Sequence, residues 1–379
     1  MKYKKYLIVT DTFYPDTTSG AKLINDLYDL LKKKNKKVLV ICARDKNIPN
    51  KKNIINVNCG PIKSRNFFIR GISEFFISRI LFAKTLNLLK LFNPEVVICY
   101  SPSIFFGFYI KKIKQLFNSR SYLILRDIFP YWAIDTKHIN NFILIYYLKK
   151  IFKNFLNIFD KIGVESKTNI SFINKIIPTK YVEYLPNWLK ITNFNKKKKV
   201  KNSFVFSGNI GHGQDIKKVF EFYNKLKLQN KTKNKFKLSI IGNQKIKTEK
   251  FNNLKKIQND EIAYLKHKSF KSFLPLLHSF EFGIVSLKED IKTVNFPGRL
   301  MTYLLCKMPI VILSNKKNEL TEFIKKNRIG CIVNSNSNIS FLIRELKIIQ
   351  KKFIKNNYNL YILKKYFNLE ENINNLINW

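Results

Sequence analysis

Short apolar runs alternate with amphipathic segments along this chain of 379 residues. The run Phe282–Leu287 predicts a buried strand, and a polar loop follows it. A helix with a wide apolar face then begins near Pro297, and Met308–Leu313 predicts a second buried strand. Strand, loop, helix and strand in this order form the repeating unit of a parallel α/β sheet. This stretch therefore predicts an α/β fold.

The first half of the chain has the same alternation. Its apolar runs predict strands at Tyr6–Thr10, Lys37–Ala43, Ile54–Val57, Glu95–Tyr100, Ser121–Arg126, Lys161–Val164 and Tyr181–Leu185. Helical spacing of apolar residues predicts helices at Ala21–Lys34, at 66–92, within Ser101–Gln115 and at Asn141–Phe159. These elements make a complete doubly wound domain.

A change of composition separates the two halves. Lys190–Lys201 consists mostly of Lys and Asn and predicts a linker. Beyond it, strands are predicted at Phe204–Phe206, Phe236–Ile241, Glu261–His267 and Gly330–Val333, before a helical tail at Ser340–Trp379. We therefore predict domains at residues 1–187 and 203–355, a linker at 188–202 and a C-terminal helix at 356–379.

Two turns between a strand and a helix are candidate anion sites. At Pro297, Gly298 and Arg299, a helix start is combined with a close backbone approach and a cation. Ser207–Asp215 is a Gly-rich turn before a helix. Each turn alone also fits an ordinary connection. Together, at the carboxyl ends of two strands of one domain, they predict a phosphorylated ligand, and our hypothesis is a diphosphate.

Other catalytic motifs are scarce. The chain has four histidines, and it contains no HExxH, GxSxG, P-loop or GxGxxG motif. A metal cluster or a Ser-His-Asp triad is therefore poorly supported. His278 is expected in the core, whereas His212 lies in the Gly-rich turn, where a ligand contact and a plain turn are equally open.

The formal net charge of +45 allows three interpretations. Binding to nucleic acid is one, attraction to an anionic membrane is another, and a Lys-rich composition without function is the third. The basic residues are spread over the whole chain, which favours composition and does not exclude the membrane. Nucleic-acid binding is disfavoured, because we find no groove-reading motif and no aromatic-basic platform.

Several features concern the compartment. The five cysteines form no CxxC pair, which predicts reduced cysteines in a cytoplasmic protein. The apolar start is too short for a signal peptide, and no apolar run approaches the ~20 residues of a membrane-spanning helix. The helix at 66–92 is expected in the core, with Phe67 or Phe68 as alternative membrane anchors, and Asn141–Phe159 is a second candidate interfacial helix.

A series of short segments carries a resemblance to a known family. They are Phe13-Tyr14-Pro15 with Ser19-Gly20, Tyr100-Ser101-Pro102-Ser103, Arg126-Asp127-Ile128-Phe129-Pro130, Leu185-Pro186-Asn187-Trp188, Ser207-Gly208-Asn209-Ile210-Gly211, and Phe296-Pro297-Gly298-Arg299-Leu300 through Pro309. In this order and spacing, the chain resembles the retaining glycosyltransferases of the GT-B fold in family 4. It is most similar to the fucosamine-transferase-like enzymes of O-antigen and capsule biosynthesis.

The resemblance implies two Rossmann-like, doubly wound domains that face each other across a cleft, with a C-terminal helix crossing back to the first domain. It implies catalytic roles for Asp127 and Arg299, with Arg126 and Asp127 on the acceptor side. It implies donor contacts from Ser19, Gly20, Gly208, Asn209, Gly211, Gln214, Pro297, Gly298, Arg299, Leu300 and Thr302. Arg299 would pair with the diphosphate, helped by the backbone N–H groups of Gly298 and Leu300, and no metal is expected.

The chain departs from the family at two positions. Val294 and Thr302 stand where family 4 usually has two glutamates. The second glutamate commonly holds the ribose, and Thr302 would replace it with a weaker neutral hydrogen bond.

The sequence thus predicts an enzyme, a glycosyltransferase (EC 2.4). The resemblance implies transfer of an N-acetylated deoxyamino hexose from a nucleotide-sugar donor, UDP-linked by expectation, to a lipid-linked glycan in surface polysaccharide or lipopolysaccharide synthesis. It would act with retention, in the cytoplasm, peripherally on the anionic inner face of the cell membrane, without a nucleic-acid partner. The alternatives are a GT-B-fold UDP-sugar epimerase, which the shortage of histidines disfavours, and a catalytically weak binding subunit, which the missing glutamates allow.

Overall fold

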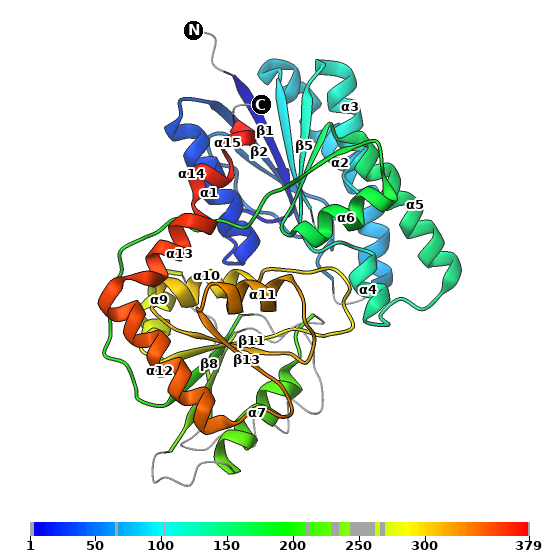
Figure 1. Cartoon of the computed structure of the whole chain (residues 1–379). Helices are drawn as coiled ribbons and strands as arrows, with labels where there is room; N and C mark the ends of the chain where they lie inside the picture. Colours follow the sequence, from blue (N-terminus) through cyan, green and yellow to red (C-terminus); the bar gives the residue numbers. More distant parts are fainter. Residues whose placement is uncertain are drawn as a thin grey trace. The chain divides into compact units, whose positions relative to one another are not determined.

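The computed structural model describes residues 4–64, 67–101, 103–208, 213–228, 235–242, 262–265 and 270–377. The chain forms two compact units (Figure 1). The N-terminal unit consists of Met1–Asn187 together with Leu369–Trp379, and the C-terminal unit consists of Trp188–Asn368.

The N-terminal unit is built on a seven-stranded parallel sheet with the order β3-β2-β1-β4-β5-β6-β7. Its strands are β1 (Lys5–Thr10), β2 (Lys37–Arg44), β3 (Ile54–Asn58), β4 (Val96–Ser101), β5 (Arg120–Leu125), β6 (Lys161–Val164) and β7 (Tyr181–Tyr184). The sequence predicted all seven within a few residues, because uniformly apolar runs mark strands that are buried on both faces.

Helices cover both faces of this sheet (Figure 1). On one face α1 (Ser19–Lys33) packs with the C-terminal α14 (Leu369–Asn372) and α15 (Asn374–Ile377), and α2 (Phe67–Phe92), α3 (Gly107–Phe117) and α5 (Phe142–Ile158) pack together on the other. The remaining helices of this unit are α4 (Tyr131–Asp135) and α6 (Lys167–Ile176). The last residues are fixed to the sheet by the Tyr6 hydroxyl, which donates to the carbonyl of Ile377 at 2.6 Å.

The C-terminal unit contains a six-stranded parallel sheet with the order β10-β9-β8-β11-β12-β13. Its strands are β8 (Ser203–Ser207), β9 (Lys237–Ile241), β10 (Ile262–Leu265), β11 (Phe282–Ser286), β12 (Ile310–Leu313) and β13 (Gly330–Val333). Its helices are α7 (Ile216–Leu228), α9 (Phe270–His278), α10 (Gly298–Leu305), α11 (Glu319–Lys326), α12 (Ile339–Asn356) and α13 (Tyr358–Phe367).

Alternate residues of the central strands face opposite helix layers. Phe204 and Phe206 pack with α7 and α12, whereas Val205 between them packs with α9, α10, α11 and α13. This period of two is the signature of a strand whose two faces are both covered. The C-terminal unit is therefore a three-layer α/β structure.

The segment predicted as a linker lies against the C-terminal unit without forming a helix or a strand longer than one bridge. Its backbone bonds to Phe367 through Leu189 (3.0 Å) and to Ser279 through Val200 (2.8 Å). The ammonium of Lys199 donates to three carbonyl oxygens at 2.7–3.2 Å. The Lys-rich composition therefore describes a surface-lying segment that is held at several points.

The strand orders create one switch point in each sheet. The chain runs from β1 outward to β3 and then crosses back to β4, and it runs from β8 outward to β10 and crosses back to β11. Open α/β sheets bind ligands outside the carboxyl ends of the strands at such a point. The residues after β1, β4, β8 and β11 are therefore the first places to look for a site.

The close packing of the second sheet gives a first prediction. A Cβ added to Gly330 would overlap the backbone carbonyl of Ile310 on β12, so Gly330→Ala should destabilise the C-terminal unit by about 1–3 kcal/mol in urea unfolding. Gly71 in α2 is the control, because it is exposed and a Cβ added there would meet no described atom within 4 Å beyond its chain neighbours and the helix backbone. Gly71→Ala should stabilise the chain by about 0.5–1 kcal/mol. Equal stability of the two variants would contradict this account.

Candidate functional site

Gly208 ends β8 at the switch point of the C-terminal unit. Its φ of +110° lies in the region that favours glycine. Its N–H donates to the carbonyl of Ile241 at 2.8 Å. A Cβ at this position would lie 3.0 Å from Nη2 of Arg299. Glycine therefore lets the turn approach the guanidinium of Arg299 closely.

Arg299 lies in the first turn of α10, after the N-cap residue Pro297. Its guanidinium stacks on the ring of Phe206, with Cζ 4.4 Å from the ring centroid. Nη1 is buried and has no hydrogen-bond partner among the described residues. Burial lowers the pKa of Arg299, yet a guanidinium keeps its charge in proteins. A buried, partly unpaired cation is costly, which indicates that this position serves a ligand.

Two further buried polar atoms belong to the loops around Arg299. Oε1 of Gln214 and Oγ1 of Thr293 also have no partner among the described residues. Gln214 is held against the end of β11 by a bridge to Leu287, and Ser286 Oγ donates to the carbonyl of Asp215 at 2.8 Å. Both segments follow strands of the switch point, so the unsatisfied polar atoms gather where a ligand is expected.

Tyr303 fixes the two strands of this switch point. Its hydroxyl accepts from the backbone N–H of Ser207 at 2.9 Å and lies 3.1 Å from the carbonyl of Ile284. Burial raises the pKa of Tyr303, so the hydroxyl keeps its proton and donates. The sequence placed Tyr303 only on the apolar face of the helix. Its hydrogen bonds to β8 and β11 join segments that are distant in the sequence, so no local sequence pattern predicts them.

Two residues of α10 that were predicted to contact the donor make hydrogen bonds within the helix. The N–H of Leu300 donates to the carbonyl of Pro297 at 2.9 Å, and its side chain is fully buried. Leu300 is therefore a core residue whose N–H is already bonded within the first turn of α10, and its contact with a diphosphate stays a prediction. Thr302 donates its hydroxyl proton to the carbonyl of Arg299 at 2.9 Å, so it offers a ligand only its lone pairs.

The other predicted donor residues lie as follows. Pro297 caps α10, and Gly298 is its first residue. Asn209 and Gly211 lie outside the described residues. In the N-terminal unit, Ser19 is the exposed first residue of α1. Gly20 packs under Tyr100, because a Cβ there would lie 2.6 Å from the tyrosine hydroxyl.

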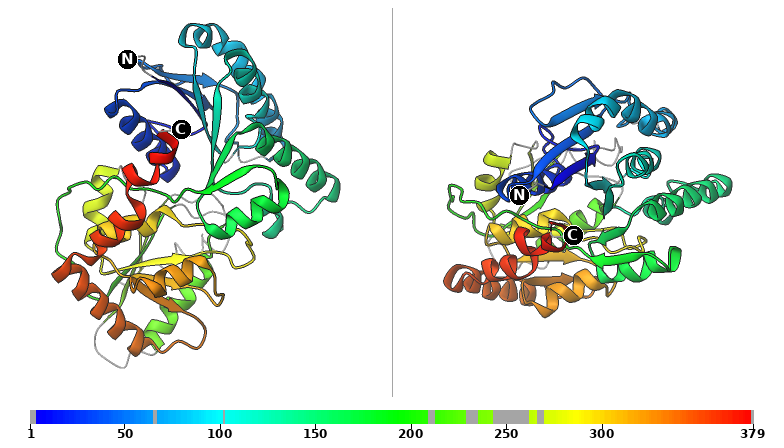
Figure 2. Two further views of the ribbon diagram at one scale, coloured as in Figure 1. Left: turned by 45° about the horizontal axis from the view of Figure 1, so that its top comes forward. Right: turned by 90° about the horizontal axis from the view of Figure 1, so that it is seen from above.

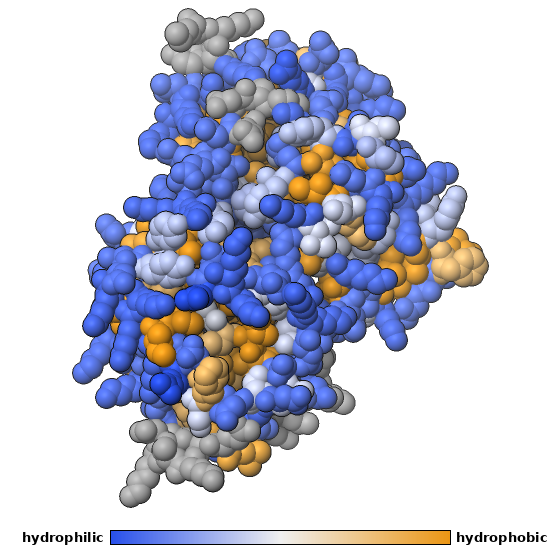
Figure 3. Space-filling view, viewed as in Figure 1, coloured by the Kyte–Doolittle hydropathy of each residue, from blue (hydrophilic) through white to orange (hydrophobic). Residues whose placement is uncertain are grey.

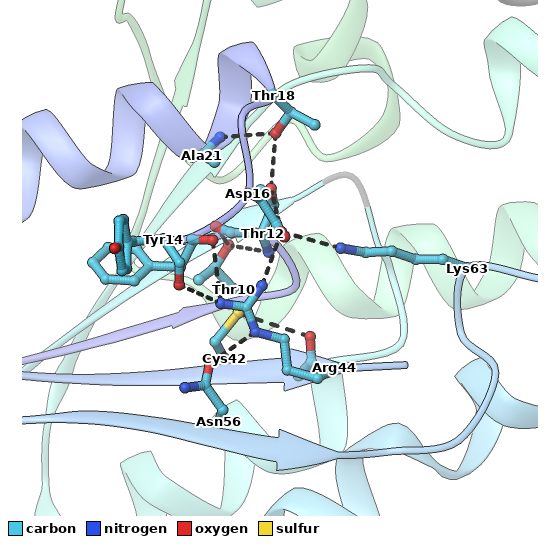
Figure 4. A network of polar contacts seen from close by, with 12 residues as sticks. Thr10, Thr12, Tyr14, Asp16, Thr18, Ala21, Cys42, Arg44, Asn56 and Lys63 are labelled. Atoms are coloured by element: carbon cyan, nitrogen blue, oxygen red, sulfur yellow. Dashed lines mark hydrogen bonds and ion pairs between the residues drawn. The ribbon is translucent and has the colours of Figure 1, made fainter. Parts of the chain in front are cut away.

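The loop between β1 and α1 is held by a buried arginine (Figure 4). Arg44, only 1% exposed, pairs with Asp16 at 2.9 Å and donates to the carbonyls of Phe13 and Tyr14 at 3.1 and 2.7 Å. Thr12 joins the hydroxyl of the N-cap residue Thr18 at 2.9 Å. The loop that leads from β1 to Ser19 and Gly20 at the start of α1 is thus held in place by buried hydrogen bonds.

Arg126, for which the resemblance implies an acceptor-side role, is bonded within the N-terminal unit. Its guanidinium is buried and donates to Asn187 at 2.8 Å and to the carbonyl of Leu185 at 2.9 Å. Asp127 is exposed and has a φ of +50°, a strained region that Asp tolerates better than most residues. Of the two neighbours only Asp127 is exposed, and its acceptor-side role stays a prediction.

The comparisons with known proteins concern the fold and the class of enzyme. Residues 218–362, which run from α7 into α13, match a family model described as "Glucosyltransferase 3-like, C-terminal domain". No curated protein sequence matches the chain. The match covers most of the C-terminal unit, including Arg299, and identifies it as a glycosyltransferase-type domain.

Solved structures match both units. Sucrose-phosphate synthase from Thermosynechococcus elongatus has a TM-score of 0.67 at 12% identity, with 99% of this chain and 97% of that chain covered. An α-glucosyltransferase in complex with UDP and DNA has a TM-score of 0.63 at 13% identity, with both chains fully covered. TarM of S. aureus, in complex with fondaparinux, α-GlcNAc-glycerol and UDP, has a TM-score of 0.66 at 10% identity, with 99% and 100% covered.

These likenesses confirm the fold prediction. The chain has the GT-B fold, with two parallel-sheet α/β domains and a helical C-terminus. The predicted enzyme class, a glycosyltransferase, agrees with the domain match and with the fold. The assignment to family 4 and to the fucosamine-transferase-like branch stays a prediction.

The arginine network of the N-terminal unit gives a second prediction. Arg44→Ala leaves Asp16 and two carbonyls without their buried partner, and should destabilise the unit by on the order of 3 kcal/mol in urea unfolding. Lys63 also pairs with Asp16, at 3.3 Å, but its side chain is 39% exposed. Lys63→Ala should therefore cost less than about 1 kcal/mol. A loss as large as that of Arg44→Ala would contradict the account.

Proposed function

We propose that this chain is a glycosyltransferase that transfers a sugar from a UDP-linked donor to a lipid-linked glycan at an anionic membrane surface. The donated sugar in this proposal is an N-acetylated deoxyamino hexose, transferred with retention during synthesis of a surface polysaccharide. The domain match and the fold support the reaction class. Arg299 in the C-terminal unit supports the UDP-linked donor, and exposed apolar residues of the N-terminal unit support binding to a membrane.

The unpaired guanidinium of Arg299 is the observation that carries the donor assignment. Its Nη1, at the switch point of the C-terminal unit, has no hydrogen-bond partner in the part of the chain that the structure describes. A diphosphate supplies charged oxygen acceptors, which match the planar fork of a guanidinium. The first turn of α10 adds its partial positive charge at the same place. A neutral ligand would leave the buried cation uncompensated.

The same contact provides catalysis. When the bond between the sugar and the diphosphate breaks, negative charge grows on the departing UDP. A cation that is already fixed over Phe206 stabilises this charge without reorganising. The proposal needs no metal ion for this step. The lone pairs of Thr302 can accept from a ribose hydroxyl, in place of the usual glutamate.

An exposed apolar helix end supports the membrane assignment. The first turns of α5 expose Phe142 (79%), Ile143, Leu144, Tyr146 (70%) and Tyr147. Figure 1 and Figure 2 show α5 projecting from the N-terminal unit, and Figure 3 shows apolar residues at this edge of the molecule. Exposed Lys149, Lys150 and Lys153 follow directly on the same helix. Aromatic residues beside lysines suit the interface of an anionic bilayer.

The exposure of apolar side chains changes along the helix α2. Its second half buries Ile77, Leu81 and Leu89 in the core, as the sequence favoured, whereas Ile72, Phe75 and Phe76 nearer its start are exposed. The side chains of Phe67 and Phe68 lie outside the described residues. None of the described helices is long and apolar enough to span a bilayer. The proposal is therefore insertion of helix ends into one leaflet.

The donor assignment is tested by titrating UDP. Arg299→Ala should weaken UDP binding by on the order of 1.5–3 kcal/mol, because a charged hydrogen bond to the diphosphate is lost. Arg344, exposed on α12 of the same unit, is the control. Arg344→Ala removes the same charge and should leave UDP binding unchanged. Equal UDP affinity of the two variants would refute the donor site.

The sugar is tested with a panel of sugar nucleotides. UDP-linked N-acetylated deoxyamino hexoses should raise the melting temperature of the wild-type chain more than UDP-glucose does, since a ligand stabilises the state that binds it. Equal shifts for all UDP-sugars would support the UDP site and contradict the proposed sugar. No shift with any sugar nucleotide would contradict the proposed function.

The membrane assignment is tested by co-sedimentation with vesicles of phosphatidylglycerol and phosphatidylcholine. Binding should fall when salt is raised, and the double variant Phe142→Ser/Tyr146→Ser should lose most of it. Leu91→Ser is the control, because Leu91 is 85% exposed at the other end of α2. Binding that is indifferent to anionic lipid, or binding to duplex DNA without binding to vesicles, would contradict the assignment.

A further inference from the structure

The switch point of the N-terminal sheet carries a second set of polar residues. Asp11 follows β1, and Tyr100 lies at the end of β4, the two strands between which the chain direction changes. Asp127 follows β5, and Glu165 follows β6. Three carboxylates and one phenol thus stand at the carboxyl ends of four neighbouring strands.

Asp11 has capacity for a ligand. Its Oδ1 is buried and has no hydrogen-bond partner among the described residues. Burial raises the pKa of this carboxyl, and Lys63, a hydrogen bond from the residue's own backbone N–H, and Arg70 offset the rise only in part. Both cations already pair with other carboxylates, Lys63 with Asp16 at 3.3 Å and Arg70 with Glu74 at 2.8 Å. The oxygen of Asp11 is therefore left to accept a hydrogen bond from elsewhere.

The groups around Tyr100 are mostly acidic although the chain as a whole is strongly basic. Burial first, and then the charge of Asp127, raises the pKa of Tyr100, and Asp11 and Glu165 act in the same direction. Arg126 opposes them, but its guanidinium is bonded to Asn187 and to carbonyl oxygens. Burial raises the pKa of the thiols of Cys42 on β2 and Cys99 on β4, and the Asp11 charge acts in the same direction, against the opposite effect of Arg44 at Cys42. The three carboxylates therefore disfavour a negatively charged ligand beside Tyr100.

The two switch points therefore differ in sign. Among the charged side chains that the structure describes, the one with an unsatisfied buried atom is a cation, Arg299, in the C-terminal unit and a carboxyl, Asp11, in the N-terminal unit. A diphosphate fits the first and is repelled by the second. A hydrogen-bond donor without negative charge fits the second, and sugar hydroxyls are such donors.

We infer that Asp11 binds the acceptor, by accepting a hydrogen bond from a hydroxyl of a neutral sugar at the β1–β4 switch point. This inference rests on the proposed function, because it names the chemistry of the acceptor. Tyr100 lies beside the same place, with its hydroxyl against Gly20, and exposed Asp127 adds a second carboxylate at the edge. The sugar to be extended is thus recognised by its hydroxyls, and a phosphate belongs to the donor.

Ligand-observed NMR with methyl β-glycosides of glucose, galactose and N-acetylglucosamine tests the inference without requiring the natural acceptor. Asp11→Asn keeps the size of the side chain but places an amide where the carboxylate accepts. The dissociation constant of a bound glycoside should rise about tenfold or more. Asp29→Asn, exposed on α1, should bind glycosides like the wild type. Asp11→Ala, with its melting temperature recorded, repeats the test with the acceptor oxygens removed.

UDP titration separates this inference from the proposed function. The inference predicts that UDP binding is the same in wild type and Asp11→Asn, while Arg299→Ala loses UDP and keeps the glycoside. Glycoside binding that is equal in wild type and both Asp11 variants, or absent in the wild type while UDP binds, overturns the acceptor assignment alone. The acceptor assignment is also overturned if glucose 1-phosphate binds at the β1–β4 switch point more tightly than methyl glucoside does. Absence of UDP binding in the wild type contradicts the proposed function instead.

Discussion

The stacking of Arg299 on Phe206 is the interaction on which the candidate donor site depends. A ring face holds a guanidinium without using its N–H groups, so the cation is fixed while Nη1 stays available. The arrangement requires a glycine at 208, because any Cβ would crowd Nη2, and it requires α10 to start at the carboxyl end of the sheet. Tyr303, one turn along α10, then ties this helix to β8 and β11.

Both units use a parallel sheet with one change of direction, yet they place opposite charges at that point. The N-terminal unit holds its β1–α1 loop with the buried Arg44, whose guanidinium is already bonded to Asp16 and to two carbonyl oxygens. The C-terminal unit leaves Arg299 partly unpaired. A structural cation and a ligand-binding cation can therefore be told apart by whether their N–H groups are already bonded. The same criterion separates Arg126, which is bonded throughout, from Asp11, which is not.

Much of the fold could be predicted from the sequence, since buried strands and amphipathic helices leave periodic patterns. The loop at Pro297, Gly298 and Arg299 could also be predicted, because the residues of a helix start are adjacent in the chain. The roles of Tyr303, Arg44 and Asp11 could not, since each depends on partners that are distant in sequence or on their absence. The burial of Arg126 could not be predicted either, because a charged residue at a strand end can turn outward or inward, and its partners Asn187 and Leu185 are distant in the sequence.

A crystal structure of the chain with UDP would test the central claim most directly. The account predicts that an oxygen of the diphosphate lies within hydrogen-bond distance of Nη1 of Arg299, next to the backbone of Gly208, with the guanidinium still stacked on Phe206. UDP bound elsewhere in the chain, or bound with Nη1 still lacking a contact, would contradict it.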